Sequence, residues 1–200
     1  IEIKKLSRKK MFLNKKKNFI YALVLSRLEF GKGHFDLVEA FTHLSNKIKR
    51  RYKIYFIGKG NPEFVKKLKN RIKELNLQNN FELTGYMDKN SREIIMNFDL
   101  LLSPTREWEG FGLSIAESLS VGVPVISTRV GGVLDYLNKT NSILVEPKSP
   151  KSLAYSLELF LRNPIKYKRK ALLGKKIIEK YYSAEAMSKK YVNHFKKINN

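Results

Sequence analysis

The feature that most constrains this chain is a regular alternation of strand-like and helix-like patterns. The run NFIYALVLSR at 18–27 is continuously apolar, which is typical of a strand covered on both faces. Between the strand-like runs, apolar residues recur at helical spacing, as in Leu37, Phe41, Leu44 and Ile48. Strands are expected at 18–27, 52–58, 81–85, 99–104, 123–128 and 142–146. The alternation predicts an α/β fold, a doubly wound parallel sheet of about six strands with helices on both faces.

The chain divides into three parts. Its 200 residues, 42% of them hydrophobic, suffice for one core, which we expect in a domain at 18–163. Segment 1–17 is interpreted as a basic interdomain linker or truncated end, because the chain starts in a Lys-rich stretch without Met. Segment 164–200 is predicted to be a basic helical tail that packs on the domain. Its expected apolar anchors are Tyr181, Tyr182, Tyr191 and Phe195.

Charge is distributed unevenly along the chain. The formal net charge is +22, which indicates an anionic partner: nucleic acid, a membrane surface or phosphorylated small molecules. The excess is greatest at the two ends, whereas segment 99–147 has six acids against three basic residues. The middle of the chain therefore presents a different surface from the ends.

Several kinds of site are disfavoured by the composition. Without cysteine there is neither a disulfide nor a thiolate metal site. His34, His43 and His194 lack ligand spacing, and each is expected to be a surface or capping residue. The aspartates are isolated and form no D-x-D pair, so no bound metal is expected. The sequence shows no apolar run of membrane-spanning length and no signal peptide.

In such a sheet, ligands bind at the carboxyl ends of the strands, so the loops there are the candidates. Loop 26–34, SRLEFGKGH, offers Arg27 and Lys32 around Gly31 and Gly33, and two cations can neutralise a diphosphate. The loop matches neither the dinucleotide fingerprint nor a P-loop. Taken alone, it favours a tight turn with solvated charges.

Loop 104–113, PTREWEGFGL, is more informative. Gly110 and Gly112 precede a helix that begins near Leu113, and free amides at a helix start attract anions. Glu109 precedes this turn and Glu117 follows it by about one helical turn, so the two carboxylates can accept bonds from sugar hydroxyls. The alternative is that both acids bind no ligand and are simply stabilised by the positive end of the helix dipole. That explanation is weaker for Glu117, which lies within an apolar helix where an acid usually has a partner.

Other residues near these loops are ambiguous. The glycine pair in TRVGGV at 128–133 either lines the same pocket or permits close packing of helix on strand. Trp108 and Phe111 either form a wall of the site or are packing residues.

Three segments resemble motifs of a known family. E-G-F-G-L-S-I-A-E at 109–117 and the S-L-S-V-G-V-P-V-I-S-T-R-V-G-G that follows it resemble the E-x7-E segment of family 4 glycosyltransferases. S-R-L-E-F-G-K-G-H at 26–34 resembles that family's G-R-L…K-G segment, with Ser26 in place of a glycine. F-E-L-T-G-Y-M at 81–87 resembles its next motif. The match runs in the right order from about residue 18 to the C-terminus.

The resemblance implies a Rossmann-like half of a GT-B fold that binds a UDP- or GDP-sugar for retaining transfer of a hexose. It places Arg27 and Lys32 at the donor diphosphate, Glu109 at the transferred sugar and Glu117 at the ribose, with Gly31 in the same loop as the cations. These positions, Glu109, Arg27 and Lys32, are the expected catalytic residues. The turn facing sugar and phosphate is Gly110, Phe111, Gly112 and Leu113, and the base is expected near Tyr86 and Met87.

The resemblance also implies partners. The acceptor-binding N-terminal domain is missing before residue 18, so we expect this fragment to bind donor and to transfer no sugar alone. No cofactor or metal is expected, the acceptor is a glycan or a lipid-linked sugar, and the pathway is surface polysaccharide or lipopolysaccharide synthesis. The expected location is the cytoplasm, with the basic ends against an anionic inner membrane face.

Two alternatives stay open at this stage. One is a basic nucleic-acid- or anion-binding module without transferase activity, which fits the ends but not the acidic middle. The other is a different GT-B enzyme, a phosphorylase or an epimerase.

Overall fold

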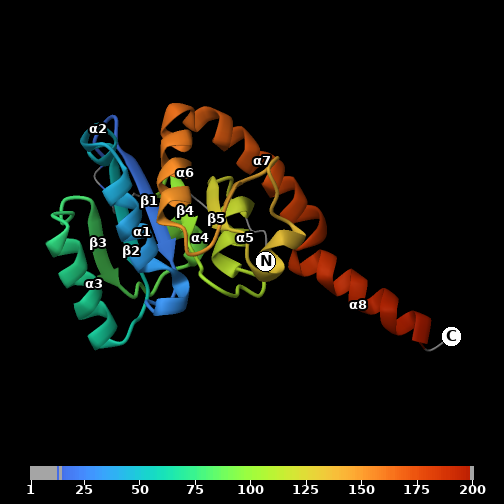
Figure 1. The fold of residues 1–200 in the computed structure, drawn as a ribbon. Coiled ribbons are helices and arrows are strands. Elements are labelled where there is room, and N and C mark those ends of the chain that lie inside the picture. Colours follow the sequence, from blue (N-terminus) through green and yellow to red (C-terminus); the bar gives the residue numbers. More distant parts are fainter. Residues whose placement is uncertain (1–12, 14, 199–200) are drawn as a thin grey trace.

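The fold is an α/β domain on one parallel sheet, as the computed structural model shows for residue 13 and residues 15–198 (Figure 1). The sheet order is β3-β2-β1-β4-β5-β6, so the predicted fold class is confirmed. The order of the strands reverses between β1 and β4: β2 and β3 lie on one side of this point, and β5 and β6 on the other. Such folds bind ligands beyond the carboxyl ends of the strands at this point. The strands are Ile20–Leu25 (β1), Tyr52–Ile57 (β2), Phe81–Gly85 (β3), Leu100–Ser103 (β4), Val125–Thr128 (β5) and Ile143–Val145 (β6).

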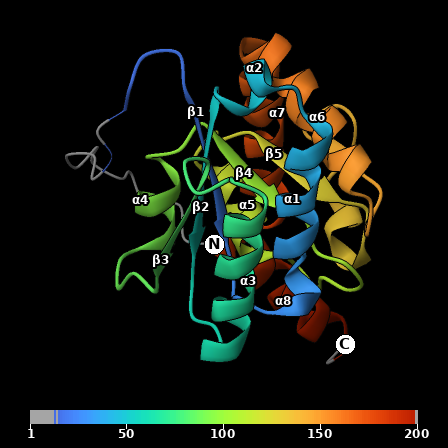
Figure 2. The ribbon, with the colours of Figure 1, turned by 60° about the vertical axis from the view of Figure 1, so that its left-hand side comes forward.

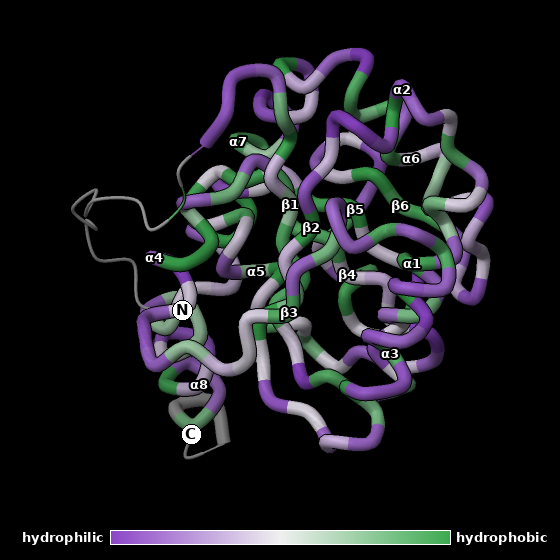
Figure 3. Tube along the Cα trace, turned by 90° about the vertical axis from the view of Figure 1, so that its left-hand side faces the viewer, coloured by the Kyte–Doolittle hydropathy of each residue, from purple (hydrophilic) through white to green (hydrophobic). Residues whose placement is uncertain are grey.

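Helices cover both faces of the sheet (Figure 2). One face carries α1 (His34–Ala40), α3 (Pro62–Glu74) and α6 (Pro150–Arg162) over a core that includes Leu37 and Phe56. The other carries α4 (Ser91–Ile95), α5 (Leu113–Ser120) and α7 (Pro164–Tyr181) over a core that includes Leu23 and Leu119. Figure 3 shows the hydrophobic strands in the centre and hydrophilic segments around them. Burial of both sheet faces explains why β1 is continuously apolar.

One predicted helix differs from the observed structure. The stripe from Leu37 to Ile48 is broken into α1, a 3-10 turn η2 (Phe41–His43) and α2 (Asn46–Lys49), because Leu44 and Ser45 adopt extended backbone conformations. A further 3-10 turn, η3 (Gly131–Asp135), starts at a glycine with φ of +60°. The remaining 3-10 turn is η1 (Phe30–Lys32).

The C-terminal tail behaves as two different helices. In α7, Ala171, Gly174 and Ile178 are buried, and Gly174 lies against Leu119 of α5. Helix α8 (Ala184–Ile198) extends away from the body of the domain (Figure 1). Of the four predicted anchors, Tyr182 packs against Phe111 and Tyr136, whereas Tyr181 is 44% exposed. The prediction is also wrong for Tyr191 and Phe195, whose side chains are 59% and 60% exposed. Their helical spacing marks an apolar stripe, but no described element faces it.

Most of the expected linker at 1–17 lies outside the described residues. The described part contacts the domain closely. Leu13 is buried, the Lys15 ammonium pairs with the Asp99 carboxylate at 2.9 Å, and the backbone amide of Lys16 donates to the Tyr21 hydroxyl at 2.8 Å.

Candidate functional site

A cavity of about 670 Å³ lies at the carboxyl edge of the sheet, where the topology predicts a ligand site. Ten of the eleven residues that the resemblance assigns to donor binding or catalysis line it, and Gly31 does not. Those lining it are Arg27, Lys32, Tyr86, Met87, Glu109, Gly110, Phe111, Gly112, Leu113 and Glu117. Segments more than 80 residues apart in the sequence therefore meet at one site.

Loop 26–34 is fixed by backbone contacts. Gly33 has φ of +71°, and a Cβ there would lie 1.8 Å from the Pro104 carbonyl oxygen, so the loop after β1 touches the loop after β4. The Arg106 amide donates to the Gly31 carbonyl at 2.9 Å, a second backbone contact between the two loops, although Gly31 lies outside the cavity wall. The Arg27 side chain is 76% exposed and pairs with Glu29 at 3.1 Å, so this cation lies at the rim.

Loop 104–113 is held from behind by the start of η3. The Gly132 amide donates to the Glu109 carbonyl at 2.9 Å, and a Cβ on Gly131 would lie 2.1 Å from that oxygen. The buried Tyr136 hydroxyl donates to the Phe111 carbonyl at 2.5 Å. The second glycine pair thus serves close packing, because neither glycine lines the cavity. A loop fixed through its backbone presents its side chains in defined positions.

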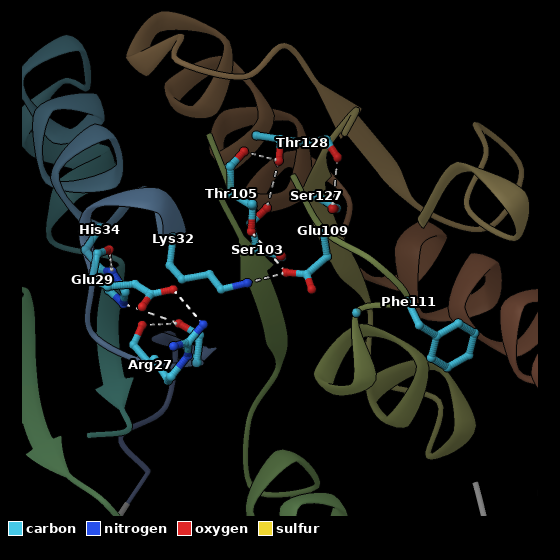
Figure 4. A network of polar contacts seen from close by, with 12 residues as sticks. Arg27, Glu29, Lys32, His34, Ser103, Thr105, Glu109, Phe111, Ser127 and Thr128 are labelled. Atoms are coloured by element: carbon cyan, nitrogen blue, oxygen red, sulfur yellow. Dashed lines mark hydrogen bonds and ion pairs between the residues drawn. The ribbon is translucent and has the colours of Figure 1, made fainter. Parts of the chain in front are cut away.

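Lys32 and Glu109 bind each other across the cavity (Figure 4). The Lys32 ammonium lies 2.8 Å from Glu109 Oε2, and each side chain is only 19% exposed. The Thr105 hydroxyl donates to the same oxygen at 3.4 Å. The cation expected at a diphosphate and the carboxylate expected at a sugar are therefore neighbours, so one ligand can contact both.

Glu117 has a different partner. The Ser91 hydroxyl donates to Glu117 Oε1 at 2.6 Å, which supplies the partner that an acid inside an apolar helix requires. Ser91 is the first residue of α4 and does not cap it: Asn90 is the N-cap and accepts from the Arg92 amide at 3.0 Å. Ser91 and Lys89 both line the cavity and were missed from the sequence, because a turn such as DKNS gives no signal of what it faces.

The aromatic residues separate into different roles. Tyr86 is 60% exposed at the cavity edge, with the Lys59 ammonium 4.8 Å from its ring centre. The Phe111 ring points away from Lys32 and Glu109 (Figure 4) and contacts Tyr136 and Tyr182. Trp108 is 71% exposed and lines no part of the cavity, so it neither packs nor forms a wall.

His34, at the end of loop 26–34, is buried with only 1% of its surface exposed. The prediction that it is a surface or capping residue is therefore wrong. Its ring packs edge-on against Phe56 at 5.0 Å between centres. Its Nδ1 lies 3.4 Å from the Glu29 carbonyl, which can only accept, so Nδ1 donates. Burial, reinforced by the nearby charge of Lys32, lowers the pKa of His34 to about 4 and keeps it neutral. His43 and His194 are exposed, as expected.

The first helix turn of α5 opens on the cavity. Its N-cap is Gly112, with φ of +68° and no side chain to accept from the first amides. Such an uncapped helix start favours an anion. Among the described residues, no group of three or more His, Asp or Glu side chains is arranged to hold a metal ion. None of the described helices combines the length and apolar character that crossing a bilayer requires.

Comparison with known proteins supplies the family. Residues 4–177 match the model of glycosyl transferases group 1. The chain belongs to this family. It is 30% identical to 2-deoxystreptamine N-acetyl-D-glucosaminyltransferase of Niallia circulans over 70% of the chain and 36% of that protein.

Solved structures agree on the fold. A glycosyltransferase from Rickettsia africae superposes with a TM-score of 0.82, at 26% identity, over 92% of the chain and 49% of that protein. HepE of Anabaena, solved in complex with UDP, gives a TM-score of 0.82 at 20% identity, over 90% of the chain and 49% of that protein. The domain is thus a Rossmann-like GT-B domain. The chain spans less than half the length of the curated relatives it matches.

Proposed function

We propose that this chain is the donor-binding half of a retaining hexosyltransferase, of family 4 type, that uses a UDP- or GDP-sugar. The observation that carries the proposal is one cavity at the switch point of the sheet, in which Lys32 and Arg27 meet Glu109 and Glu117. A nucleotide sugar has a diphosphate between two polyhydroxylated rings. Two cations and two carboxylates in one cavity supply groups for the diphosphate and for the hydroxyls of both rings.

Each part of the cavity then has a role. The diphosphate lies against Lys32, with Arg27 at the rim and the uncapped start of α5 contributing its amides. Glu109 accepts bonds from hydroxyls of the transferred sugar, and Glu117 accepts them from the ribose. The base rests near Tyr86 and Met87, at the far edge of the cavity.

Catalysis in this proposal requires stabilisation of the departing diphosphate. Breaking the bond between the sugar and the diphosphate leaves negative charge on the diphosphate, which Lys32, Arg27 and the α5 amides stabilise in a partly enclosed site. The proposal assigns this work to the chain's own cations and needs no resident metal.

The acceptor belongs to the part of the enzyme that this chain does not contain. Because the chain spans less than half of its relatives, we propose that residues 1–200 bind donor but transfer no sugar alone. The acceptor is a glycan or lipid-linked sugar of surface polysaccharide or lipopolysaccharide synthesis. Donor binding and transfer are thus separable.

The proposed location is the cytoplasm, at an anionic inner membrane face. The stripe Met187, Tyr191, Val192 and Phe195 on α8 is exposed, beside Lys189 and Lys190, a combination suited to an anionic interface. Sedimentation with vesicles containing phosphatidylglycerol tests this. Equal sedimentation with neutral phosphatidylcholine vesicles, or none with either, contradicts it.

Calorimetric titration with UDP and GDP tests the proposed function. One of them is expected to bind and to raise the melting temperature, with the same affinity in EDTA. Lys47→Met, which removes an exposed cation far from the cavity, serves as a control and should bind equally well. Binding of generic DNA with no binding of UDP or GDP would favour the nucleic-acid alternative instead.

A further inference from the structure

We propose that Ser91 is a positioning residue that orients Glu117 and makes this end of the cavity select ribonucleotides over 2′-deoxyribonucleotides. The inference rests on the proposed function and deepens it, because it names a residue that positions the carboxylate proposed to bind the ribose. It starts from the 2.6 Å hydrogen bond between the Ser91 hydroxyl and Glu117 Oε1.

The Ser91 hydroxyl is available for this bond because the local structure does not need it. Ser91 is the first residue of α4, and the Asn90 side chain already caps the helix by accepting from the Arg92 amide. Glu117 lies on α5, which packs against α4, so the bond joins two neighbouring helices. Both residues line the cavity.

The direction of the hydrogen bond determines what a ligand must offer. An ionised carboxylate only accepts, so Ser91 donates its single proton to Glu117. The hydroxyl oxygen then has only lone pairs left, and the carboxylate also has lone pairs left. The Ser91–Glu117 pair therefore presents acceptors alone, and a group bound there must bring O–H donors.

A ribose meets this requirement better than a deoxyribose. Its 2′ and 3′ hydroxyls are adjacent and offer two donors, whereas 2′-deoxyribose offers one. The apolar side chains of Met87 and Ile94 line the same cavity, and an acceptor left without a donor beside apolar groups is costly. Sites built to bind a hydroxyl reject analogues that lack it more strongly than sites that only fit its shape.

The same pair opposes a phosphate. A phosphate group also presents acceptors, so the Ser91–Glu117 end disfavours it, and the Lys32 end favours it. The cation Lys89 lines the cavity too and has an interaction of its own. The arrangement therefore orients the nucleotide, with its ribose at Glu117 and its diphosphate at Lys32.

The experiment compares the affinities for UDP and 2′-deoxy-UDP, and for GDP and 2′-deoxy-GDP, by calorimetry. The unaltered protein is expected to prefer the ribonucleotide by about tenfold or more, the worth of one hydrogen bond to a charged group. Ser91→Ala should lower this preference to about threefold or less, chiefly by weakening binding of the ribonucleotide. Ser91→Thr keeps a hydroxyl and should restore the preference.

Ser120→Ala is the matched control. The Ser120 hydroxyl donates to the backbone carbonyl of the same Glu117 at 2.7 Å, outside the cavity, so its loss should leave the preference unchanged. The inference is overturned if the Ser91→Ala protein keeps the preference of the unaltered protein. It is also overturned if Ser91→Ala lowers the affinities for the ribonucleotide and the 2′-deoxyribonucleotide equally. Failure of the unaltered protein to bind either ribonucleotide overturns the proposed function itself.

Discussion

The two ends of the cavity hold a carboxylate in contrasting ways. At one end Glu109 faces a cation, Lys32, at 2.8 Å. At the other end Glu117 faces a neutral hydroxyl, that of Ser91, at 2.6 Å. The first end is neutralised before a ligand arrives and can exchange one charged partner for another. At the second end the hydroxyl of Ser91 leaves the remaining lone pairs of the carboxylate to accept from hydroxyl donors. Each end therefore favours a different part of the same ligand.

The largest expected effect comes from breaking the backbone support of the Glu109 end. Gly131→Ala places a Cβ about 2 Å from the Glu109 carbonyl oxygen at a positive φ, so we expect a loss of about 2–3 kcal/mol in unfolding free energy. Urea unfolding measures it. Gly31→Ala, where no atom lies within 4 Å of the new Cβ, is the control and should change stability little. Equal stability of the two variants would show that loop 104–113 is not held this way.

Removing the cation of the Glu109 end sharpens the comparison. Lys32→Met keeps the length of the side chain but loses its charge. Affinity for the nucleoside diphosphate should fall about 30-fold, because a charge-assisted contact is worth about 2 kcal/mol. The preference for UDP over 2′-deoxy-UDP, which depends on the Glu117 end, should persist. Loss of that preference together with affinity would mean that the two ends are not independent.

Loop 26–34, which carries Lys32, also contains a neutral buried histidine, His34. Its burial predicts that the stability of the protein depends on pH. The pKa of His34 is about 4 in the folded protein and about 6.5 in the unfolded chain, so the unfolded chain binds the proton more tightly. This contribution to stability is fully present above pH 6.5 and is lost as the pH falls towards 4. Between pH 6.5 and 5 the loss should be about 1.5 kcal/mol.

Unfolding measured at both pH values checks the His34 prediction. His34→Phe should flatten the pH dependence of stability, whereas His43→Gln, at an exposed position, should not. Identical pH profiles for the His34→Phe and unaltered proteins would contradict the assignment.

The smallest effect is expected from the carboxylate that pairs with Lys32. Glu109→Gln removes a negative charge near the diphosphate and frees the cation, so affinity for UDP or GDP should rise about threefold. Turnover of the full-length enzyme should fall, because Glu109 is proposed to bind the transferred sugar. Weaker nucleotide binding in this variant would show that Glu109 supports Lys32 instead of competing for it.

Much of the fold was predictable because the positions of the strands along the chain follow local patterns. Continuous apolar runs identify the strands, since both sheet faces are covered. The end of helix α1 at Ala40 was not predictable. The apolar stripe continues to Ile48, whereas the backbone at Leu44 and Ser45 is extended. The exposure of Phe195 was also missed, since helical spacing marks an apolar face without showing what covers it.

The site was predictable where glycines and charges coincide at strand ends. Glu109 and Glu117 were found from the glycine turn before α5, and Lys32 was added by the resemblance to family 4 glycosyltransferases. All three line one cavity. Pairings within the site were not predictable: Lys32 with Glu109 spans 77 positions, and Ser91 with Glu117 spans 26. These pairings depend on how neighbouring strands bring distant loops together, which no local pattern records.

A crystal structure of the protein with UDP or GDP, whichever binds, tests the central claim most directly. The account predicts diphosphate oxygens within hydrogen-bonding distance of the Lys32 ammonium, and ribose hydroxyls donating to Glu117 beside Ser91. A nucleotide bound with its ribose at Glu109, or outside this cavity, would contradict it.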